Sequence, residues 1–164
     1  MQDYLLLTTY YLILYYMKTL AVNKRAKFDY DLKDKYEAGL VLSGQEVKSV
    51  KTGHISLKGS FVTIKDGEFY LTNATIPKYK FAGELKNYDP TKSRKLLLNK
   101  SEIKKLLGKS RSEGLTMVPI RVYTKKRLIK LEFGVGRGKK KYDKRENIKD
   151  RESKIRLNRT MKSR

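Results

Sequence analysis

Apolar and polar residues alternate in the second half of the chain in a way that predicts paired strands. The runs Phe61–Lys65 and Glu68–Leu71 flank Asp66-Gly67, a dipeptide that favours a tight hairpin turn. Thr116–Thr124 and Leu128–Val135 alternate in the same way, and the lysines between them fit a second turn. We therefore expect two antiparallel hairpins.

Two shorter patterns lie earlier in the chain. Leu20–Leu32 mixes basic residues with spaced apolar ones, which predicts an exposed lead-in that runs into a strand. Tyr36–Leu42 is short and apolar enough to form another strand, although Glu37 and Ala38 interrupt the pattern.

Two short helices are predicted from the residues at their ends. Ser43 and Glu46 match the S-x-x-E capping box, in which each side chain accepts a hydrogen bond from the other residue's amide, and Gly53 supplies a left-handed stop. The second helix starts at Asn99. Its C-terminal end is either Gly108 or Gly114, and the pattern does not decide between these two positions.

These elements predict a mainly β fold with some α structure. Short strands with hairpin turns and two to three short helices fit a small antiparallel β-barrel of the oligonucleotide-binding type, followed by a basic C-terminal tail. Such barrels close their strand edges and present an outer face to nucleic acid.

Charge divides the chain into three parts. The 164 residues carry 39 Lys/Arg and 17 Asp/Glu, a net charge of +22, which indicates an anionic partner. Residues 17–136 are long enough to bury a core. Residues 137–164 hold thirteen Lys/Arg against four acids, with too few apolar residues for a core. We expect Gly134, Gly136 and Gly138 to be flexible and to let this tail leave the barrel.

The tail has only weak helical support of its own. Asp150–Lys154 and Glu152–Arg156 are i,i+4 pairs in the acid-first order, each worth about 0.2–0.5 kcal/mol. Because these pairs do not offset the unfavourable nucleation of an isolated helix, we expect disorder in the free protein and a helix once RNA neutralises the charge. Asp143 does not fit a segment that only gathers phosphates.

Residues 1–16 differ from the rest in composition. They contain no Lys or Arg, and their apolar run Tyr4–Tyr16 is shorter than the roughly 20 residues of a membrane-spanning helix. A secretory signal would need a basic start and a small-residue cleavage site, and this segment has neither. We expect an upstream in-frame extension ahead of a working start at Met17; the alternative is a membrane-surface anchor.

Groups for catalysis or metal binding are sparse. The chain has no Cys and a single histidine, His54, beside Gly53 at a predicted helix end. The glycines of Gly134–Gly138 lack the GxGxxG spacing of a dinucleotide loop. We therefore expect no catalytic residue, no cofactor and no metal site. The lack of Cys is compatible with a reducing compartment.

Basic clusters on the body suit RNA. The clusters are Lys24, Arg25 and Lys27 in the first, and Lys92, Arg94 and Lys95 beside Leu96–Leu98 in the second. Exposed Tyr and Arg stack on unpaired bases, while Lys neutralises phosphates. Glu37 does not fit a simple polyanion surface, and it could pair either with a base amino group or with a neighbouring lysine.

Five stretches carry a family resemblance. They are, in order, Asn23-Lys-Arg-Ala, Tyr36-Glu-Ala-Gly-Leu, Gly44-x-Glu46-Val-Lys-Ser, Arg94-Lys-Leu-Leu-Leu and Gly138-Lys-Lys-x-x-Asp143-Lys-Arg. On these residues, the chain from Asn23 to Arg164 resembles SmpB, the family of bacterial SsrA-binding proteins. Residues 1–16 have no counterpart in that family, which favours the upstream-extension interpretation.

The resemblance implies a non-enzymatic adaptor for ribosome rescue by trans-translation. Its barrel would bind the tRNA-like domain of transfer-messenger RNA, and its tail would enter the empty mRNA channel of a stalled ribosome. The partners implied are transfer-messenger RNA, the ribosome and, indirectly through the charged RNA, elongation factor Tu, in the cytoplasm and without DNA or membrane.

The resemblance also implies residues for each surface. RNA-facing residues of the barrel would be Asn23, Glu37, Leu96, Leu97 and Leu98, with Lys24 and Arg25 alongside; Arg94 and Lys95 join them from the second basic cluster. Residues at or near the decoding centre would be Gly138, Lys139, Lys140, Asp143, Lys144 and Arg145.

Two other interpretations stay open from the residues alone. One is a generic ribosome-, rRNA- or tRNA-binding translation factor whose tail is a nonspecific RNA anchor. The other is a peripheral membrane protein that uses the N-terminal apolar run together with the basic surface.

Overall fold

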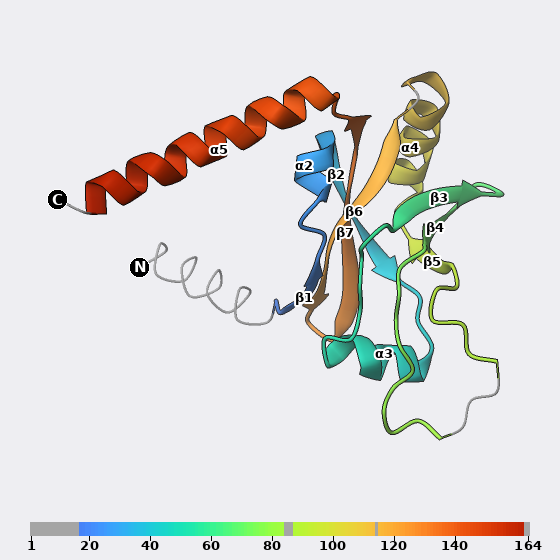
Figure 1. The fold of residues 1–164 in the computed structure, drawn as a ribbon. Helices are drawn as coiled ribbons and strands as arrows, with labels where there is room; N and C mark the ends of the chain where they lie inside the picture. Colours follow the sequence, from blue (N-terminus) through green and yellow to red (C-terminus); the bar gives the residue numbers. More distant parts are fainter. Residues whose placement is uncertain (1–16, 84–86, 114, 163–164) are drawn as a thin grey trace, which may run out of the picture.

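Strand pairings that run around a ring organise the folded body (Figure 1). The computed structural model describes residues 17–83, 87–113 and 115–162, so the predicted extension Met1–Tyr16 lies outside the described part. The antiparallel pairings follow the order β6 (Thr116–Lys125), β3 (Phe61–Lys65), β4 (Glu68–Thr72), β5 (Arg94–Leu97), β2 (Tyr30–Leu40), β7 (Leu128–Gly138) and back to β6, with β1 (Thr19–Val22) added to β6. The ring-like sheet agrees with the predicted small β architecture.

The β3–β4 hairpin forms where the sequence predicts it. Asp66 and Gly67 both take positive φ angles, 52° and 76°, which a two-residue hairpin turn requires. The register places Val62 opposite Leu71, and both side chains are buried. The turn therefore fixes which face of the hairpin enters the core.

The β6–β7 hairpin is also confirmed, and Lys126 supplies its positive φ of 57°. The alternating apolar residues of β7 are all buried: Ile129, Leu131, Phe133 and Val135. On β6 the register shifts between Pro119 and Arg121. Tyr123 is only 3% exposed, and its neighbour Val122 is buried as well, so simple alternation does not hold at this end of β6.

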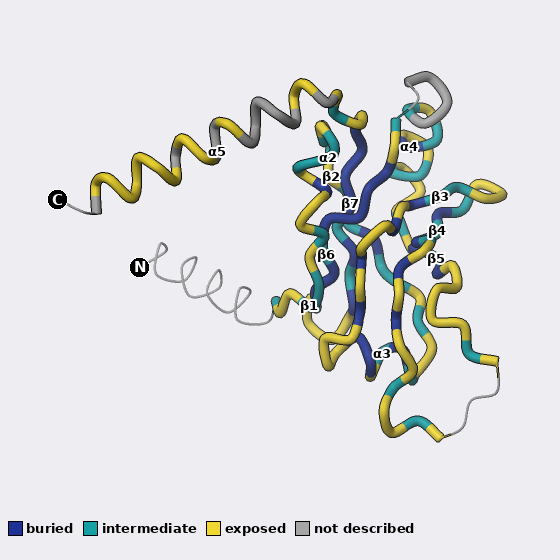
Figure 2. The backbone as a smooth tube through the Cα atoms, in the orientation of Figure 1, coloured by how far each residue is buried: buried dark blue, intermediate teal, exposed yellow. Residues whose placement is uncertain are grey.

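The core residues come mainly from the strands of the ring, which carry the buried, dark-blue positions in Figure 2. The largest fully buried apolar side chains include Phe69, Leu71 and Ile76 from the middle of the chain and Phe133 from β7. Fully burying a side chain of this size contributes about 1.5–3 kcal/mol. None of these core residues belongs to the tail.

Two helices begin at the predicted caps. α3 (Gly44–Lys51) crosses one end of the ring (Figure 1), and the capping box forms, with the Ser43 amide donating to Oε2 of Glu46 at 2.8 Å. α4 (Lys100–Glu113) follows Asn99, whose amide donates to Oε2 of Glu102 at 3.1 Å. It continues past Gly108, so the nearer of the two predicted ends is wrong.

Four elements differ from the predicted pattern. The segment Leu20–Leu32 does run into a strand, but it also contains most of β1 and all of α2 (Ala26–Asp29), which were not predicted. β2 starts at Tyr30, whereas we expected a strand over Tyr36–Leu42, and β5 had no prediction. The first half of β2 alternates exposed charged residues with half-buried ones. Its strand conformation comes from the backbone pairing with β7, which runs from Tyr30 to Gly39 on the β2 side.

Glycines in β7 serve close packing, and our expectation of a flexible hinge at Gly134–Gly138 is wrong. Gly134 and Gly136 are paired with β2 and buried. A Cβ on Gly136 would lie 1.9 Å from the carbonyl oxygen of Asp31, and one on Gly134 would lie 3.0 Å from the Leu32 side chain. β2 can approach β7 this closely because positions 134 and 136 carry no side chain. The strand itself continues to Gly138.

The tail is a single helix, α5 (Lys141–Lys162), which points away from the ring (Figure 1). The disorder expected of the free tail and the helix expected on RNA binding both stay predictions. Between ring and helix, the Lys139 amide donates to the carbonyl of Asp29 at 2.8 Å. Among the described residues, no helix combines the length and apolarity needed to cross a membrane.

Candidate nucleic-acid interface

Asn23 fixes the turn that carries the first basic cluster. Its amide donates to the Ile120 carbonyl at 2.7 Å, and its Nδ2 donates to the Pro119 carbonyl at 3.0 Å. Its Oδ1 accepts from the Arg25 amide at 3.2 Å. Asn23 therefore binds the β1–α2 turn to β6 and leaves Lys24 exposed beside it. Its own side chain is half-buried.

The first basic cluster borders an open cleft. The cleft has a volume of about 630 Å³ and lies between the β1–α2 turn and residues 55–61, with Lys24, Lys58 and Phe61 on its walls. Arg25 pairs with Asp29 at 3.6 Å, and its side chain is 74% exposed. An exposed pair of this kind is worth under about 1 kcal/mol, so Arg25 can exchange it for a phosphate.

Glu37 lies in a cluster of donors from β6 and β7. It accepts hydrogen bonds from the Tyr123 hydroxyl and from Nζ of Lys125 at 3.1 and 3.2 Å, and Nζ of Lys130 lies 3.7 Å away. The side chain of Glu37 is 35% exposed. The sequence suggested either a base amino group or a neighbouring lysine as the partner of Glu37. In the protein without RNA, the partners are Lys125 and Lys130.

Electrostatics keep this carboxyl ionised. Burial tends to raise the pKa of Glu37, but the hydrogen bonds from Tyr123 and Lys125 and the charge of Lys130 outweigh it and hold the pKa below its ordinary value. Burial and the Glu37 carboxylate raise the pKa of Tyr123, so its hydroxyl stays a donor.

A ladder of charges continues across the outer face of the sheet. Glu37 lies opposite Glu132 in the β2–β7 register, an arrangement of like charges that is unfavourable by itself. Glu132 accepts from Nε of Arg121 at 2.6 Å and lies 4.0 Å from Lys35. Glu37 and Glu132 thus each have their own basic partners. The two carboxylates are partly buried, and basic side chains surround them on this face.

Leu97 joins this face through strand register. It lies opposite Gly39, two residues after Glu37 on the same face of β2. A Cβ on Gly39 would lie 3.3 Å from that of Leu97, so the glycine makes room for it. Leu97 is 57% exposed, and Lys95 on the same strand pairs with Glu68 at the surface. The structure therefore brings together Glu37 and Leu97, which are 60 positions apart in the sequence.

Leu96 and Leu98 do not share this exposure. Leu96 is 4% exposed and belongs to the core, and Leu98 is partly buried against the same core. Alternation along the strand explains this, because neighbours on a strand point to opposite faces. The expectation that Leu96 faces RNA is corrected, and only Leu97 of the three presents a free apolar surface.

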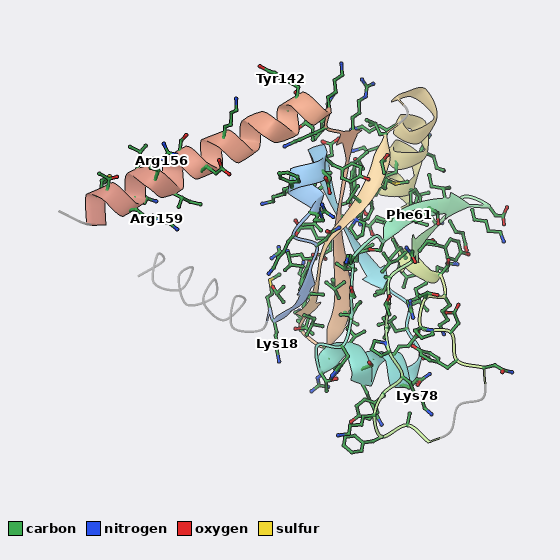
Figure 3. All side chains as sticks on the ribbon, in the orientation of Figure 1. Lys18, Phe61, Lys78, Tyr142, Arg156 and Arg159 are labelled. Atoms are coloured by element: carbon green, nitrogen blue, oxygen red, sulfur yellow. The ribbon has the colours of Figure 1, made fainter. Side chains whose placement is uncertain are left out.

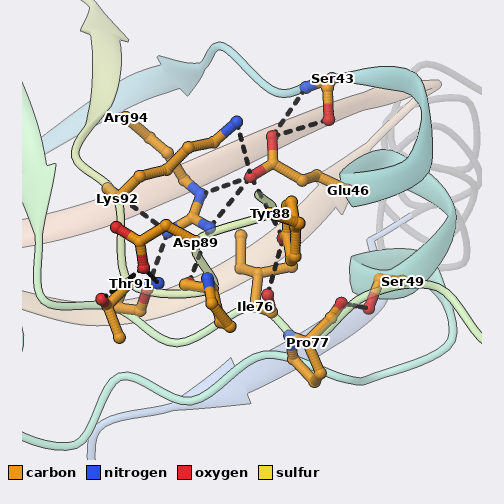
Figure 4. A network of polar contacts seen from close by, with 12 residues as sticks. Ser43, Glu46, Ser49, Ile76, Pro77, Tyr88, Asp89, Thr91, Lys92 and Arg94 are labelled. Atoms are coloured by element: carbon orange, nitrogen blue, oxygen red, sulfur yellow. Dashed lines mark hydrogen bonds and ion pairs between the residues drawn. The ribbon is translucent and has the colours of Figure 1, made fainter. Parts of the chain in front are cut away.

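Arg94 is likewise an interior residue (Figure 4). Its guanidinium donates to Oε1 of Glu46 at 2.9 and 3.0 Å and to the carbonyls of Ala74, Lys92 and Pro90 at 2.7–2.9 Å. With 2% of its surface exposed, it has no face for RNA. We therefore remove Arg94 from the expected contacts. The sequence predicted that Glu46 caps α3, but not that it also pairs with Arg94.

The tail residues lie at the junction of β7 and α5. Gly138 ends β7, and Nζ of Lys139 donates to the Lys27 carbonyl at 3.2 Å, which brings the tail base next to the first basic cluster. The Lys140 amide donates to Oδ2 of Asp143 at 3.2 Å. Asp143 thus accepts at the helix N-terminus, where a negative charge is favourable. The side chains of Lys144 and Arg145 lie outside the described set.

On α5, Tyr142 near the start of the helix and Arg156 and Arg159 toward its end are exposed (Figure 3). The single histidine, His54, has its Nδ1 2.9 Å from the Thr52 hydroxyl at the end of α3, a structural contact. Among the residues that the structure describes, no group of three or more His, Asp or Glu could hold a metal ion.

These features define a class: a small, strongly basic β protein with a ring-like antiparallel sheet, a charged outer face and a helical cationic arm. The chain belongs to the SmpB protein family, whose sequence profile matches residues 20–163.

Curated relatives are similar over nearly the whole chain. The SsrA-binding protein of Geobacillus kaustophilus is 46% identical over 147 residues, which is 90% of this chain and 94% of that protein. Those of Thermosipho africanus and of a Sulfurihydrogenibium species are 47% and 49% identical, covering 89% and 88% of this chain and 98% and 95% of theirs.

A solved structure is similar in fold. It is described as "tmRNA-SmpB: a journey to the center of the bacterial ribosome", and the match has a TM-score of 0.59 at 44% identity. It covers 74% of this chain and 85% of the other. The ring-like sheet with its helices is therefore the fold of this family.

Proposed function

We propose that this protein binds the tRNA-like domain of transfer-messenger RNA and delivers it to stalled ribosomes for trans-translation. The observation that carries the proposal is the similarity to SsrA-binding proteins over about nine-tenths of the chain. The protein acts by positioning RNA and catalyses no reaction itself. Partners are the RNA and the ribosome in the cytoplasm, with elongation factor Tu reached through the charged RNA.

The RNA-binding surface of the body is the face around Glu37, which we call the Glu37 face: Lys35, Glu37, Leu97, Arg121, Lys125 and Lys130. Its ionised Glu37 accepts from a base amino group, as a carboxylate does in base recognition. The lysines that now pair with it turn to phosphates as RNA arrives, and Leu97 packs against a sugar or base. Asn23 supports this surface by holding Lys24 and Arg25 on the first basic cluster.

The second working part is α5 with the residues before it. A helix of 22 residues is about 33 Å long, and its excess of Lys and Arg suits a channel lined by RNA. In the proposed role it takes the place of mRNA near the decoding centre. Gly138, Lys139, Lys140, Asp143, Lys144 and Arg145 lie at its base.

Truncation tests the division of labour. A chain that ends at Lys140 keeps all of β7, including the Tyr30–Gly138 pair and the Lys139–Asp29 hydrogen bond. We expect this variant to bind transfer-messenger RNA with affinity close to the full chain and to lose tagging of stalled polypeptides. Loss of both activities together, in a variant that still unfolds cooperatively, would contradict the two-part model.

The identity of the RNA that the protein binds in its host distinguishes this proposed function from that of a generic translation factor. We expect the protein, captured from its host, to bring down transfer-messenger RNA in large excess over bulk tRNA and rRNA fragments. Competition by bulk tRNA at equal affinity would favour the generic factor. Fractionation of chains starting at Met1 and at Met17 tests the membrane interpretation, because only the longer chain would move to membranes.

A further inference from the structure

A second group of aromatic and basic side chains lies far from α5. It is the segment Pro77–Gly83, which we call the aromatic loop, in which Lys78, Tyr79, Lys80 and Phe81 alternate cation and ring. Figure 3 labels Lys78 at the end of the molecule opposite Tyr142 of α5. Neither the Glu37 face nor the tail includes this loop.

The base of the loop is held firmly to the body. The buried Ser49 hydroxyl donates to the Pro77 carbonyl at 2.7 Å (Figure 4). The Tyr88 hydroxyl donates to the Ile76 carbonyl at 2.7 Å, and the Ile76 amide donates to Pro90 at 2.9 Å. The loop therefore starts from a fixed point beside α3, so its side chains are presented at a defined place.

The two rings form an open pair. Tyr79 and Phe81 have centroids 5.6 Å apart with planes at 64°. Phe81 is 78% exposed, the largest exposed fraction among the exposed large hydrophobic side chains of the described residues. Exposing a ring of this size is unfavourable in water, and packing within the protein does not relieve it. Its exposed surface is available to a partner.

Cations surround the rings. Nζ of Lys48 from α3 lies 5.8 Å from the Tyr79 centroid, and Nζ of Lys80 lies 5.9 Å from the Phe81 centroid. Lys78 is exposed on the loop itself, and Lys51 is exposed on α3, the helix that carries Lys48. Residues 76–83 contain no acid, and the first acid after them in the sequence is Glu84, whereas on the Glu37 face each lysine is paired with a carboxylate.

We propose that the aromatic loop stacks an unpaired RNA base on the exposed Phe81 ring, with the Tyr79 ring at the edge of that stack, while Lys48, Lys78 and Lys80 bind the adjacent phosphates. The combination of ring faces and lysines at one site is what single-stranded nucleic acid requires. An apolar protein surface would instead leave several ammonium groups desolvated without partners. The identification of the ligand as RNA rests on the proposed function, and the site adds a third RNA contact to it.

A single tryptophan tests stacking directly, because the chain contains no Trp. Phe81→Trp places the sole indole in the loop, and the exposure of Phe81 makes the change compatible with folding. We expect a single-stranded oligo(A) to quench its fluorescence and the same strand paired with oligo(U) to leave it unchanged. Equal quenching by both would mean charge binding without stacking and would overturn the proposal.

Affinity provides the second measurement. Replacing both rings, with Tyr79→Leu and Phe81→Leu together, should weaken oligo(A) binding by about 5- to 100-fold. The matched control, Tyr79→Phe with Phe81→Tyr, keeps both rings and should bind like the wild type. Equal affinity of all three proteins would overturn the stacking site.

Two further arms separate the possible failures. If the wild type fails to bind transfer-messenger RNA in the same assay, the proposed function fails; if it binds and the leucine variant still binds oligo(A) equally, only this inference fails. Vesicles that contain anionic phosphatidylglycerol should leave the Phe81→Trp emission unshifted. A blue shift with vesicles, without quenching by RNA, would assign the loop to membranes.

Discussion

Glu46 and Arg94 meet inside the protein, with Oε1 of the carboxylate 3.0 Å from Nε of the guanidinium. Both side chains are only 1% exposed. Because Glu46 belongs to α3 and Arg94 to β5, the pair joins the helix across the end of the ring to a strand of the ring. The same guanidinium holds the carbonyls of Ala74 and Pro90, which lie at the two ends of the long segment between β4 and β5.

Arg94 is therefore expected to matter for stability. Arg94→Met leaves the Glu46 carboxylate buried with one partner lost, and breaking a buried pair in this way costs about 3–5 kcal/mol. Urea unfolding followed by circular dichroism measures the change.

A matched control is Lys92→Met. Lys92 lies 3.4 Å from the same carboxylate oxygen, but its side chain is 44% exposed, so its loss should cost under about 1 kcal/mol. RNA affinity of the folded Arg94→Met protein should be nearly unchanged. A large loss of affinity at unchanged stability would return Arg94 to the RNA-binding residues.

The pH dependence of folding should report Glu46. Burial tends to raise its pKa, but the Ser43 amide and the Arg94 charge outweigh burial and hold the pKa below the ordinary value of 4.5. The contribution to stability is then complete above pH 4.5 and is lost as pH falls through the lower pKa of the folded state. Glu46→Gln should have a shallower fall in unfolding free energy below pH 4.5, measured by denaturant titration at several pH values.

Glu37 also titrates in this range, and its pKa is lowered as well. The relevant quantity is therefore the difference between wild type and Glu46→Gln. Parallel pH profiles for the two proteins would rule out the assigned role of the Glu46 carboxylate.

A methyl group at position 136 should disrupt the sheet. Gly136→Ala brings Cβ to 1.9 Å from the Asp31 carbonyl, so β2 and β7 must separate. Forcing extra atoms into a packed site typically costs about 1–3 kcal/mol, and a clash with backbone belongs at or above the upper end. Thermal unfolding measures it.

Gly138→Ala is the control for that substitution, since a Cβ there meets nothing within 4 Å. Its expected change lies within about 0.5 kcal/mol. If both variants were equally stable, the close approach of β2 would not be the reason for glycine at position 136.

RNA affinity should depend on Glu37 more than on an ordinary surface acid. Glu37→Ala removes the acceptor and leaves Tyr123, Lys125 and Lys130 without their shared partner. A hydrogen bond to a charged group is worth about 1.5–3 kcal/mol, so binding of transfer-messenger RNA should weaken by roughly tenfold or more. A filter-binding titration at fixed salt measures it.

Asp31→Ala, on the same strand but exposed and outside the Glu37 face, is the matched control. Removing a surface acid from a basic protein should leave affinity unchanged or slightly raised. Equal effects of the two variants would make Glu37 a structural residue only.

Sequence patterns predicted the elements whose causes are local. The Ser43–Glu46 cap and the Asp66-Gly67 turn involve residues within four positions of one another, and both form. The interior role of Arg94 could not be predicted, because its partner Glu46 lies 48 positions away. Gly136 was misinterpreted for the same reason, since Asp31 is distant in the chain and its carbonyl leaves no pattern in the sequence.

The candidate site divides in the same way. Family resemblance pointed to Glu37, Leu97 and Asn23, but not to Tyr123, which is 86 positions from Glu37 and supplies its hydroxyl donor. Resemblance also treated Leu96 to Leu98 as one surface, whereas strand alternation buries Leu96 and exposes Leu97. Placing residues on faces required the strand register.

The short connection from β7 to α5 fixes how far the tail helix reaches from the sheet. Only Lys139 and Lys140 separate the last residue of the strand from the first residue of the helix, and Lys139 is bonded to Asp29 and Lys27. In its helical form the arm therefore leaves the ring from a fixed origin, and its tip stands about 33 Å away. Each residue inserted into α5 would lengthen the reach by about 1.5 Å and rotate the tip by about 100°, so length and phase of the arm are set together.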